Sequence, residues 1–287
     1  MLLILSSVIC PGCSQTLNLA STWPARPVVI NGKYTDFGDA TAYYDERQKV
    51  TLNLYNDNDY VYICLISRNR EFESRLMESG LMVWFGPDPG KAKTLGIRFP
   101  IGMKAMGMSL EDGVNRPRGR QGDDAQAGTE DEKTREKERA KERDLEKRLD
   151  ALVGLQDELE IASGPGPAKE GRTKLSLEAA AKQGIEATLG RQNGYFVYEL
   201  KVPLEKNDRY QYGIGVKQGM PLALSMEMAP MSGPGMPGKG NGPDKPEKEG
   251  GKPQERDDEM PVAGGFASDS LQLQATIALA PPSETRQ

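Results

Sequence analysis

The sequence predicts an all-β fold, a two-sheet antiparallel β-sandwich that carries a charged helical insertion and a disordered Gly/Pro-rich loop. Short runs rich in β-branched and aromatic residues recur between turn-forming residues, as in a sandwich. One run, residues 60–66, is apolar on both faces, which is typical of a strand in the middle of a sheet covered on both sides. Two long polar segments have little to bury, so only part of the 287 residues can belong to the core.

The composition excludes several classes of function. A net charge of -5 gives no support for a nucleic-acid partner, which requires a clustered basic face. Histidine is absent, so the commonest general base and the commonest zinc ligand are missing. No apolar run is long enough for a membrane-spanning helix.

Residues 1–13 resemble a bacterial lipoprotein signal. A short apolar run ends in small residues just before Cys13, which would become the lipidated first residue of the mature chain. The alternative is a plain N-terminal strand. Removal of the signal would take Cys10 with it and leave Cys64 without a disulfide partner. This interpretation places the protein in the bacterial cell envelope, anchored to a membrane and facing the periplasm or the cell surface.

The first part of the sandwich is expected at 14–110. Its central feature is a hairpin, in which two apolar runs flank the turn residues 56–59. Gly80 is placed to end a short amphipathic helix. The expected elements, in order, are a strand at 17–20, a strand at 28–33, strands at 50–55 and 60–66, a helix at 71–79, a strand at 81–85 and a last strand that ends at Pro100.

Residues 111–172 are predicted to be a charged helical insertion. Most residues of 130–150 are charged, with acidic and basic side chains four apart, so a solvent-exposed helix is expected. Its second half adds an apolar stripe that includes Leu145, Leu149 and Leu152. Two interpretations stay open: the stripe packs on the chain's own sandwich, or it binds a protein partner.

The second part of the sandwich is expected at 173–230. The segment 195–203 alternates apolar and polar residues, the period of a half-buried strand. Residues 231–262 are a low-complexity loop of Gly, Pro, Lys and Glu, and 263–287 hold the closing strand and a tail. The expected elements are a helix at 175–183, a hairpin of 184–189 with 195–203, and strands at 210–217, 222–228 and 270–279.

Several segments together carry a family resemblance. They are an Ile-Asn-Gly opening at 30–32, the strand–NDND–strand hairpin, GLMVWFGPDPGKAKTLGIRFP at 80–100, YFVYELKVPL at 195–204 and YQYGIGVKQG at 210–219. Over 28–110 and 182–280 the chain resembles the carbohydrate-binding family 9-like (CBM9-like, DOMON-related) β-sandwich domains, in their bacterial lipoprotein branch. The resemblance implies a β-sandwich and a carbohydrate ligand, such as a cell-envelope glycan.

Trp84, Arg98 and Tyr195 are the candidate ligand-binding residues. Sugar rings stack on aromatic side chains while polar neighbours bind the hydroxyl groups. Trp84 alternates with Val83 and Phe85, so its side chain points to the opposite face of its strand. Such a residue belongs either to a binding face or to a sandwich core.

The remaining chemistry is sparse. Methionine clusters such as Met103, Met106 and Met108 could bind Cu(I), although methionine more often fills a core. No carboxylate is set apart by its context, and Glu199 is expected in a structural ion pair with Lys201 or Arg98. The sequence therefore predicts a non-enzymatic extracytoplasmic binding module without a cofactor. The alternative is a structural or protein-interaction lipoprotein that has no small-molecule ligand.

Overall fold

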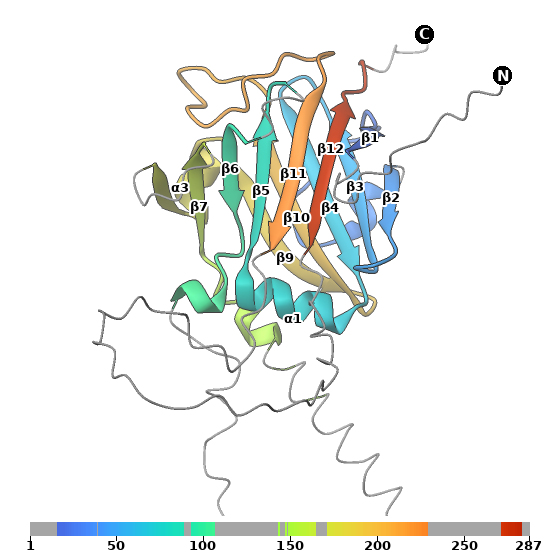
Figure 1. The fold of residues 1–287 in the computed structure, drawn as a ribbon, viewed down its shortest axis with the longest axis vertical. Helices are drawn as coiled ribbons and strands as arrows, with labels where there is room; N and C mark the ends of the chain where they lie inside the picture. The colour runs from blue at the N-terminus through green and yellow to red at the C-terminus, as the bar shows by residue number, and fades with distance from the viewer. Residues whose placement is uncertain are drawn as a thin grey trace, which may run out of the picture.

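Two β-sheets packed face to face form the folded unit (Figure 1), which confirms the predicted β-sandwich. The computed structural model describes residues 16–38, 40–88, 93–106, 143, 147, 149–164, 171–228 and 271–282. The predicted lipoprotein signal with Cys13, most of the charged helix and the low-complexity loop at 231–262 lie outside the described residues.

The five-stranded sheet is antiparallel and has the order β2-β3-β4-β10-β9. Strand β4 lies at its centre, as its two apolar faces predict. Asn193 and Gly194, both with positive φ, form the turn between β9 and β10, as two-residue hairpin turns require. The strands are β2 (Thr41–Asp45), β3 (Val50–Asn56), β4 (Tyr60–Ser67), β9 (Glu186–Gln192) and β10 (Tyr195–Pro203).

The seven-stranded sheet has the order β1-β12-β11-β5-β6-β7-β8. All its pairs are antiparallel except β1 with β12, which places the first and last described strands side by side. The strands are β1 (Leu17–Ala20), β5 (Leu81–Gly86), β6 (Leu95–Arg98), β7 (Glu158–Ser163), β8 (Arg172–Ser176), β11 (Leu222–Met228) and β12 (Gln272–Ala278).

Short helices complete the fold. Helix α1 (Arg70–Ser79) crosses one end of the sandwich (Figure 1), begins at the N-cap Asn69 and inserts apolar residues such as Phe72 and Leu76 into the core. It ends at Gly80, whose positive φ suits a helix terminus. The others are α3 (Leu177–Lys182), η1 (Tyr34–Phe37) and η3 (Met103–Met106).

Two predicted strands are wrong. Residues 28–33 form no ladder and instead lie on the outer face of the five-stranded sheet, where Val28 and Ile30 contact a second hydrophobic cluster. Residues 210–217 belong to a loop whose N–H groups fold back on the end of β10. Ile214 donates to the carbonyl of Pro203, and Val216 donates to that of Leu204. These bonds occupy N–H groups that a ladder with a neighbouring strand would need, so residues 210–217 form no strand.

Strand β7 and the start of β8 lie inside the range 111–172, which the sequence predicts to be a helical insertion. Leu149 and Leu152 belong to the main hydrophobic core, and Leu145 lies outside the described residues. Asp150 lies 2.6 Å from Arg191 Nε on β9. The end of the helix therefore packs on its own sandwich.

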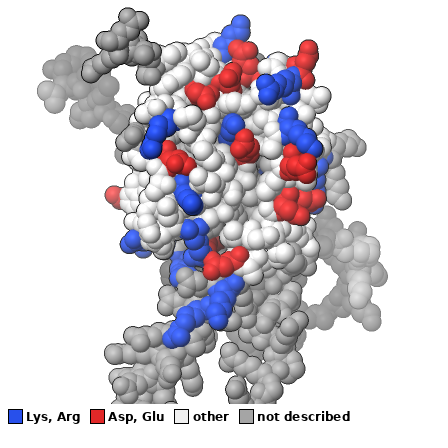
Figure 2. Space-filling model, turned by 180° about the vertical axis from the view of Figure 1, so that it is seen from behind, with Lys and Arg blue, Asp and Glu red and all other residues white. Residues whose placement is uncertain are grey.

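Seen from behind (Figure 2), the side of the molecule that carries the five-stranded sheet mixes acidic and basic side chains with uncharged surface. Cys64, at the centre of that sheet, is a buried free thiol. Among the described residues, no helix has the length and hydrophobicity needed to cross a membrane.

Candidate functional site

Trp84 lies on the outer face of the seven-stranded sheet. Its neighbours Val83 and Phe85 point into the core between the sheets, as the alternation predicts. The indole ring lies against Gly96 of β6, so closely that a Cβ on Gly96 would lie 2.6 Å from it. Only 5% of Trp84 is exposed. The ring thus lies on the outer face of the sheet but offers little surface to a sugar.

Arg98 lies beside Trp84 on the same sheet, and its guanidinium group is hydrogen-bonded within the protein. It donates a 2.8 Å hydrogen bond from Nη2 to the carbonyl of Ser79. Burial lowers the pKa of the Arg98 guanidinium, and the nearby Glu160 carboxylate opposes that shift. Arg98 therefore joins β6 to the end of α1.

Tyr195 lies on the five-stranded sheet, so the structure does not bring it together with Trp84 and Arg98. The guanidinium carbon of Arg68 lies 4.0 Å from the centre of its ring, a cation–π contact. The ring of Tyr34 meets it edge-on at 5.4 Å between centroids. Arg68 occupies one face of the Tyr195 ring, which leaves less of it for stacking.

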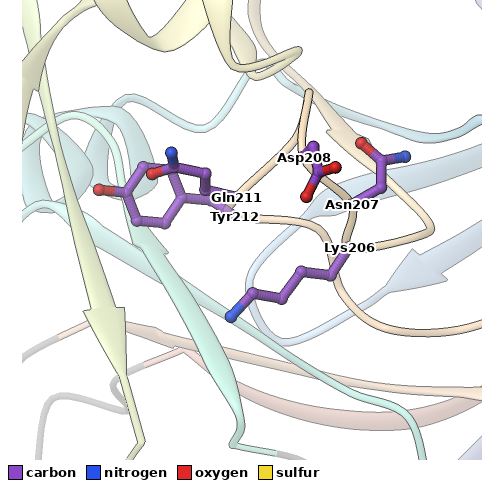
Figure 3. Close-up of a pocket in the computed structure, with 5 residues that line it drawn as sticks. All are labelled: Lys206, Asn207, Asp208, Gln211 and Tyr212. Carbon is purple, nitrogen blue, oxygen red and sulfur yellow. The ribbon is translucent and has the colours of Figure 1, made fainter.

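A surface hollow of about 600 Å³, which the sequence did not single out, lies in the loop that follows β10 (Figure 3). We call it the loop hollow. Its walls combine amide, carboxylate and ammonium groups with one aromatic ring, the kinds of group that bind sugars. The lining residues are Lys206, Asn207, Asp208, Gln211 and Tyr212.

The loop around the hollow is held in one conformation. Asn207 Oδ1 accepts hydrogen bonds from the backbone N–H groups of Arg209 and Tyr210, at 3.0 and 2.9 Å. Gly213 passes so close to Glu205 that a Cβ there would lie 2.1 Å from the Glu205 carbonyl oxygen. These contacts pre-form the hollow, which lowers the entropic cost of binding a ligand.

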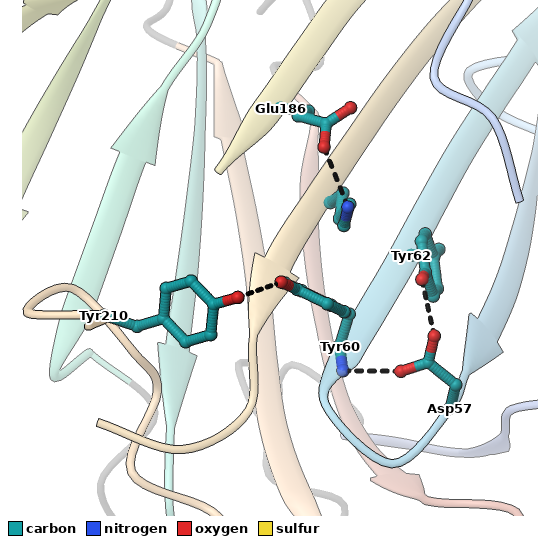
Figure 4. A network of polar contacts seen from close by, with 6 residues as sticks. Asp57, Tyr60, Tyr62, Glu186 and Tyr210 are labelled. Atoms are coloured by element: carbon teal, nitrogen blue, oxygen red, sulfur yellow. Dashed lines mark hydrogen bonds and ion pairs between the residues drawn. The ribbon is translucent and has the colours of Figure 1, made fainter. Parts of the chain in front are cut away.

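A tyrosine network anchors the same loop to the five-stranded sheet (Figure 4). The Tyr210 hydroxyl is hydrogen-bonded to the Tyr60 hydroxyl, and Lys201 Nζ lies 4.2 Å from the centre of the Tyr60 ring. The neighbouring Tyr62 donates from its hydroxyl to Asp57 Oδ2 at 2.6 Å. Burial, followed by the hydrogen bond to Asp57, raises the pKa of Tyr62.

Glu199 does not make the predicted ion pair. Its Oε2 accepts two 2.7 Å hydrogen bonds, from the backbone N–H groups of Asn31 and Gly32. Lys201 Nζ instead lies 2.8 Å from Glu186. The sequence offered no signal for this contact, because the donors are backbone groups more than 160 residues away.

Among the described residues, no group of three or more His, Cys, Asp or Glu could hold a metal ion. Of the methionines, Met103, Met226 and Met228 are part of the main core, the role that competes with copper binding. Met108 lies outside the described residues.

Comparisons with known proteins do not assign the chain to a family. No protein-family model and no curated protein matches it.

Proposed function

We propose that the protein is a non-enzymatic extracytoplasmic binding module for a carbohydrate, such as a cell-envelope glycan, and that the loop hollow receives the sugar. The observation that supports this proposal is the lining of the hollow. Lys206 and Gln211 can donate hydrogen bonds, Asp208 can accept them, and Tyr212 adds an aromatic surface. Sugar hydroxyl groups require both donors and acceptors.

The same lining favours binding over hydrolysis. Asp208 is the one carboxylate among the residues that line the hollow. Most glycoside hydrolases place two carboxylates at a fixed separation across the bond that is cleaved. A single exposed carboxylate suits recognition of a hydroxyl pair.

Glycan-array binding of the purified protein tests the site. We expect Asp208→Ala and Gln211→Ala each to weaken binding about tenfold, because each removes a hydrogen bond worth about 1.4 kcal/mol. The control is Lys217→Ala, an exposed change outside the lining of the hollow. Equal binding by all three variants would remove the hollow as the sugar site. A parent protein that binds no glycan would favour the structural or protein-interaction alternative.

The cell-envelope location rests on Cys13. If this residue is lipidated, Cys13→Ser should move the protein from the membrane fraction to the soluble extracytoplasmic fraction. Fractionation followed by mass spectrometry of the N-terminus measures both the location and the modification. An unchanged distribution, or an N-terminal peptide that retains Met1, would contradict lipid anchoring.

A further inference from the structure

Residues 28–37, which we call the covering segment, lie across the outer face of the five-stranded sheet. Phe37 stacks on Tyr55 of β3, with 5.3 Å between ring centroids. Val28, Ile30 and Tyr34 pack against the same cluster. The sheet residues that belong to this hydrophobic cluster are Tyr55, Tyr62, Cys64 and Val197.

Glu199 fastens this segment from below. The residue lies on β10, has 0% exposure, and uses Oε2 to accept both N–H bonds from Asn31 and Gly32. Its other oxygen, Oε1, is buried and has no hydrogen-bond partner. Gly32, with φ of +76°, lies against Gly190 so that a Cβ would be 3.0 Å from the Gly190 Cα. Only a segment without a side chain at this position can approach the sheet so closely.

The charged side chains near Glu199 do not compensate the negative charge of its carboxylate. On β4 the residue opposite is Cys64, and on β9 it is Thr188. Asp36 of η1 is the charged side chain that acts on Glu199 from the covering segment, and it is also acidic. Lys201, on the same face of β10, is paired with Glu186. Within the described residues, then, two backbone N–H groups are the favourable partners of a buried carboxylate.

We propose that Glu199 is a proton-dependent latch, which holds the covering segment closed when the carboxyl group is protonated and loosens the segment when it ionises. An ionised carboxylate that is buried without a cation carries a large desolvation cost. Lifting the segment admits water to the carboxylate and removes that cost. Opening also exposes the apolar residues beneath, including Tyr55 and Val197.

The direction of the pH dependence follows from the closed state. Burial raises the pKa of Glu199 to about 7, against the lowering effect of the Gly32 and Asn31 hydrogen bonds. In an open segment the carboxyl group is solvated, with an ordinary pKa of about 4.3. The closed state therefore binds the proton more tightly. It is most favoured below pH of about 4.3 and loses this advantage as the pH rises through about 7.

Amide hydrogen exchange on the full chain tests the latch. We expect the protection factors of residues 28–37 to fall on the order of 50-fold between about pH 5 and pH 8. In Glu199→Gln, which cannot ionise, this pH dependence should disappear. Glu178→Gln is the control, because it removes an exposed carboxylate that is not among the groups acting on Glu199 and should keep the dependence. Amides of β12 report whether the whole protein opens instead of the segment.

Protection of residues 28–37 that does not vary with pH in the wild-type protein would overturn the proposal. So would an equal pH dependence in Glu199→Gln. If Glu199→Gln does not fold, the wild-type protein still decides the matter through ¹³C NMR titration of the Glu199 carboxyl group. A midpoint close to 7 is expected, and a midpoint close to the solvated value of about 4.3 would contradict the latch.

Discussion

Trp84 illustrates how one neighbour determines the role of a side chain. The outer face of its sheet also carries polar residues, among them Ser225 opposite Trp84 and the Lys93–Glu227 ion pair. Gly96 leaves an open space beside Trp84, and the indole ring fills it. A large aromatic group is therefore buried on a face that points away from the main core.

This packing predicts a stability effect for Trp84→Ala. We expect the free energy of unfolding to fall by about 3–5 kcal/mol, the usual cost of removing a buried aromatic side chain. Urea denaturation measures the change. Tyr44→Ala is the control, because Tyr44 is an exposed aromatic residue on β2 and should change stability little.

The opposite result would restore Trp84 as a ligand residue. A folded Trp84→Ala protein of wild-type stability that no longer binds glycan would place the ring on a binding face. Loss of both stability and binding would be explained by the packing alone, so the two measurements are made on the same preparation.

At the residue scale, the sequence predicted correctly to which face of the sheet a side chain points, but it did not predict which groups that side chain contacts. The alternation of Val83, Trp84 and Phe85 gave the correct face for each side chain, because successive residues of a strand point to opposite sides. The partner of Glu199 was wrong, since its donors belong to residues 31 and 32 and come close only in the folded sandwich. Neighbouring sequence positions carry no information about such a contact.

Among the secondary-structure elements, the end of the insertion helix shows most clearly how a connecting segment contributes to the core. Leu149 is fully buried in the core, whereas Leu155, six residues later, is 57% exposed. The Arg191–Asp150 ion pair and the contact of Leu149 hold the same turn against the sandwich. The helix end thus contributes to the core in addition to connecting η3 with β7.

Leu149→Ala and Leu155→Ala form a matched pair for this interpretation. The first should lower the free energy of unfolding by about 2–5 kcal/mol, because it leaves a cavity in the core. The second should change it by less than about 0.5 kcal/mol, as surface substitutions do. Thermal or urea denaturation measures both. Similar small effects would mean that the helix end is not packed, and the stripe would again be available to a protein partner.

The predicted elements were most accurate where two local signals agreed. The hairpin of β3 and β4 combines apolar runs with an Asn/Asp turn, and β11 has the predicted bounds 222–228. The predicted strand at 210–217 failed because its apolar residues pack individually, with Ile214 and Val216 in the core and their N–H groups turned back to β10. The loop hollow was missed because no signal in the sequence assigned a function to the Asn-Asp turn at 207–208.

At the scale of the whole molecule, the two ends of the described chain meet at one corner of the sandwich. Strand β1 pairs with β12 in one sheet, and the next residues form a bridge between Thr22 and Tyr55 of β3 in the other. Asn56, buried at the end of β3, lies at this junction. Its side chain contacts the residues that follow both the N-terminal and the C-terminal strand.

Asn56 connects the ends of β1, β3 and β12 through both ends of its amide group. Oδ1 accepts from the backbone N–H of Ala280 at 2.8 Å and from the Ser21 hydroxyl. Nδ2 donates to the carbonyl of Ala280 at 3.0 Å. Because Asn56 is fully buried, its removal leaves some of these groups without a partner in a site that excludes water.

Asn56→Ala should therefore lower the free energy of unfolding by about 2–3 kcal/mol. We also expect faster amide exchange in β1 and at the end of β12, with little change in β4, because the lost bonds join the chain ends and not the sheet centre. Asn58→Ala is the control, since Asn58 is exposed in the turn between β3 and β4. If both variants are equally stable, or if exchange in β4 rises as much as in β1, the junction at Asn56 does not hold the ends of the sandwich together.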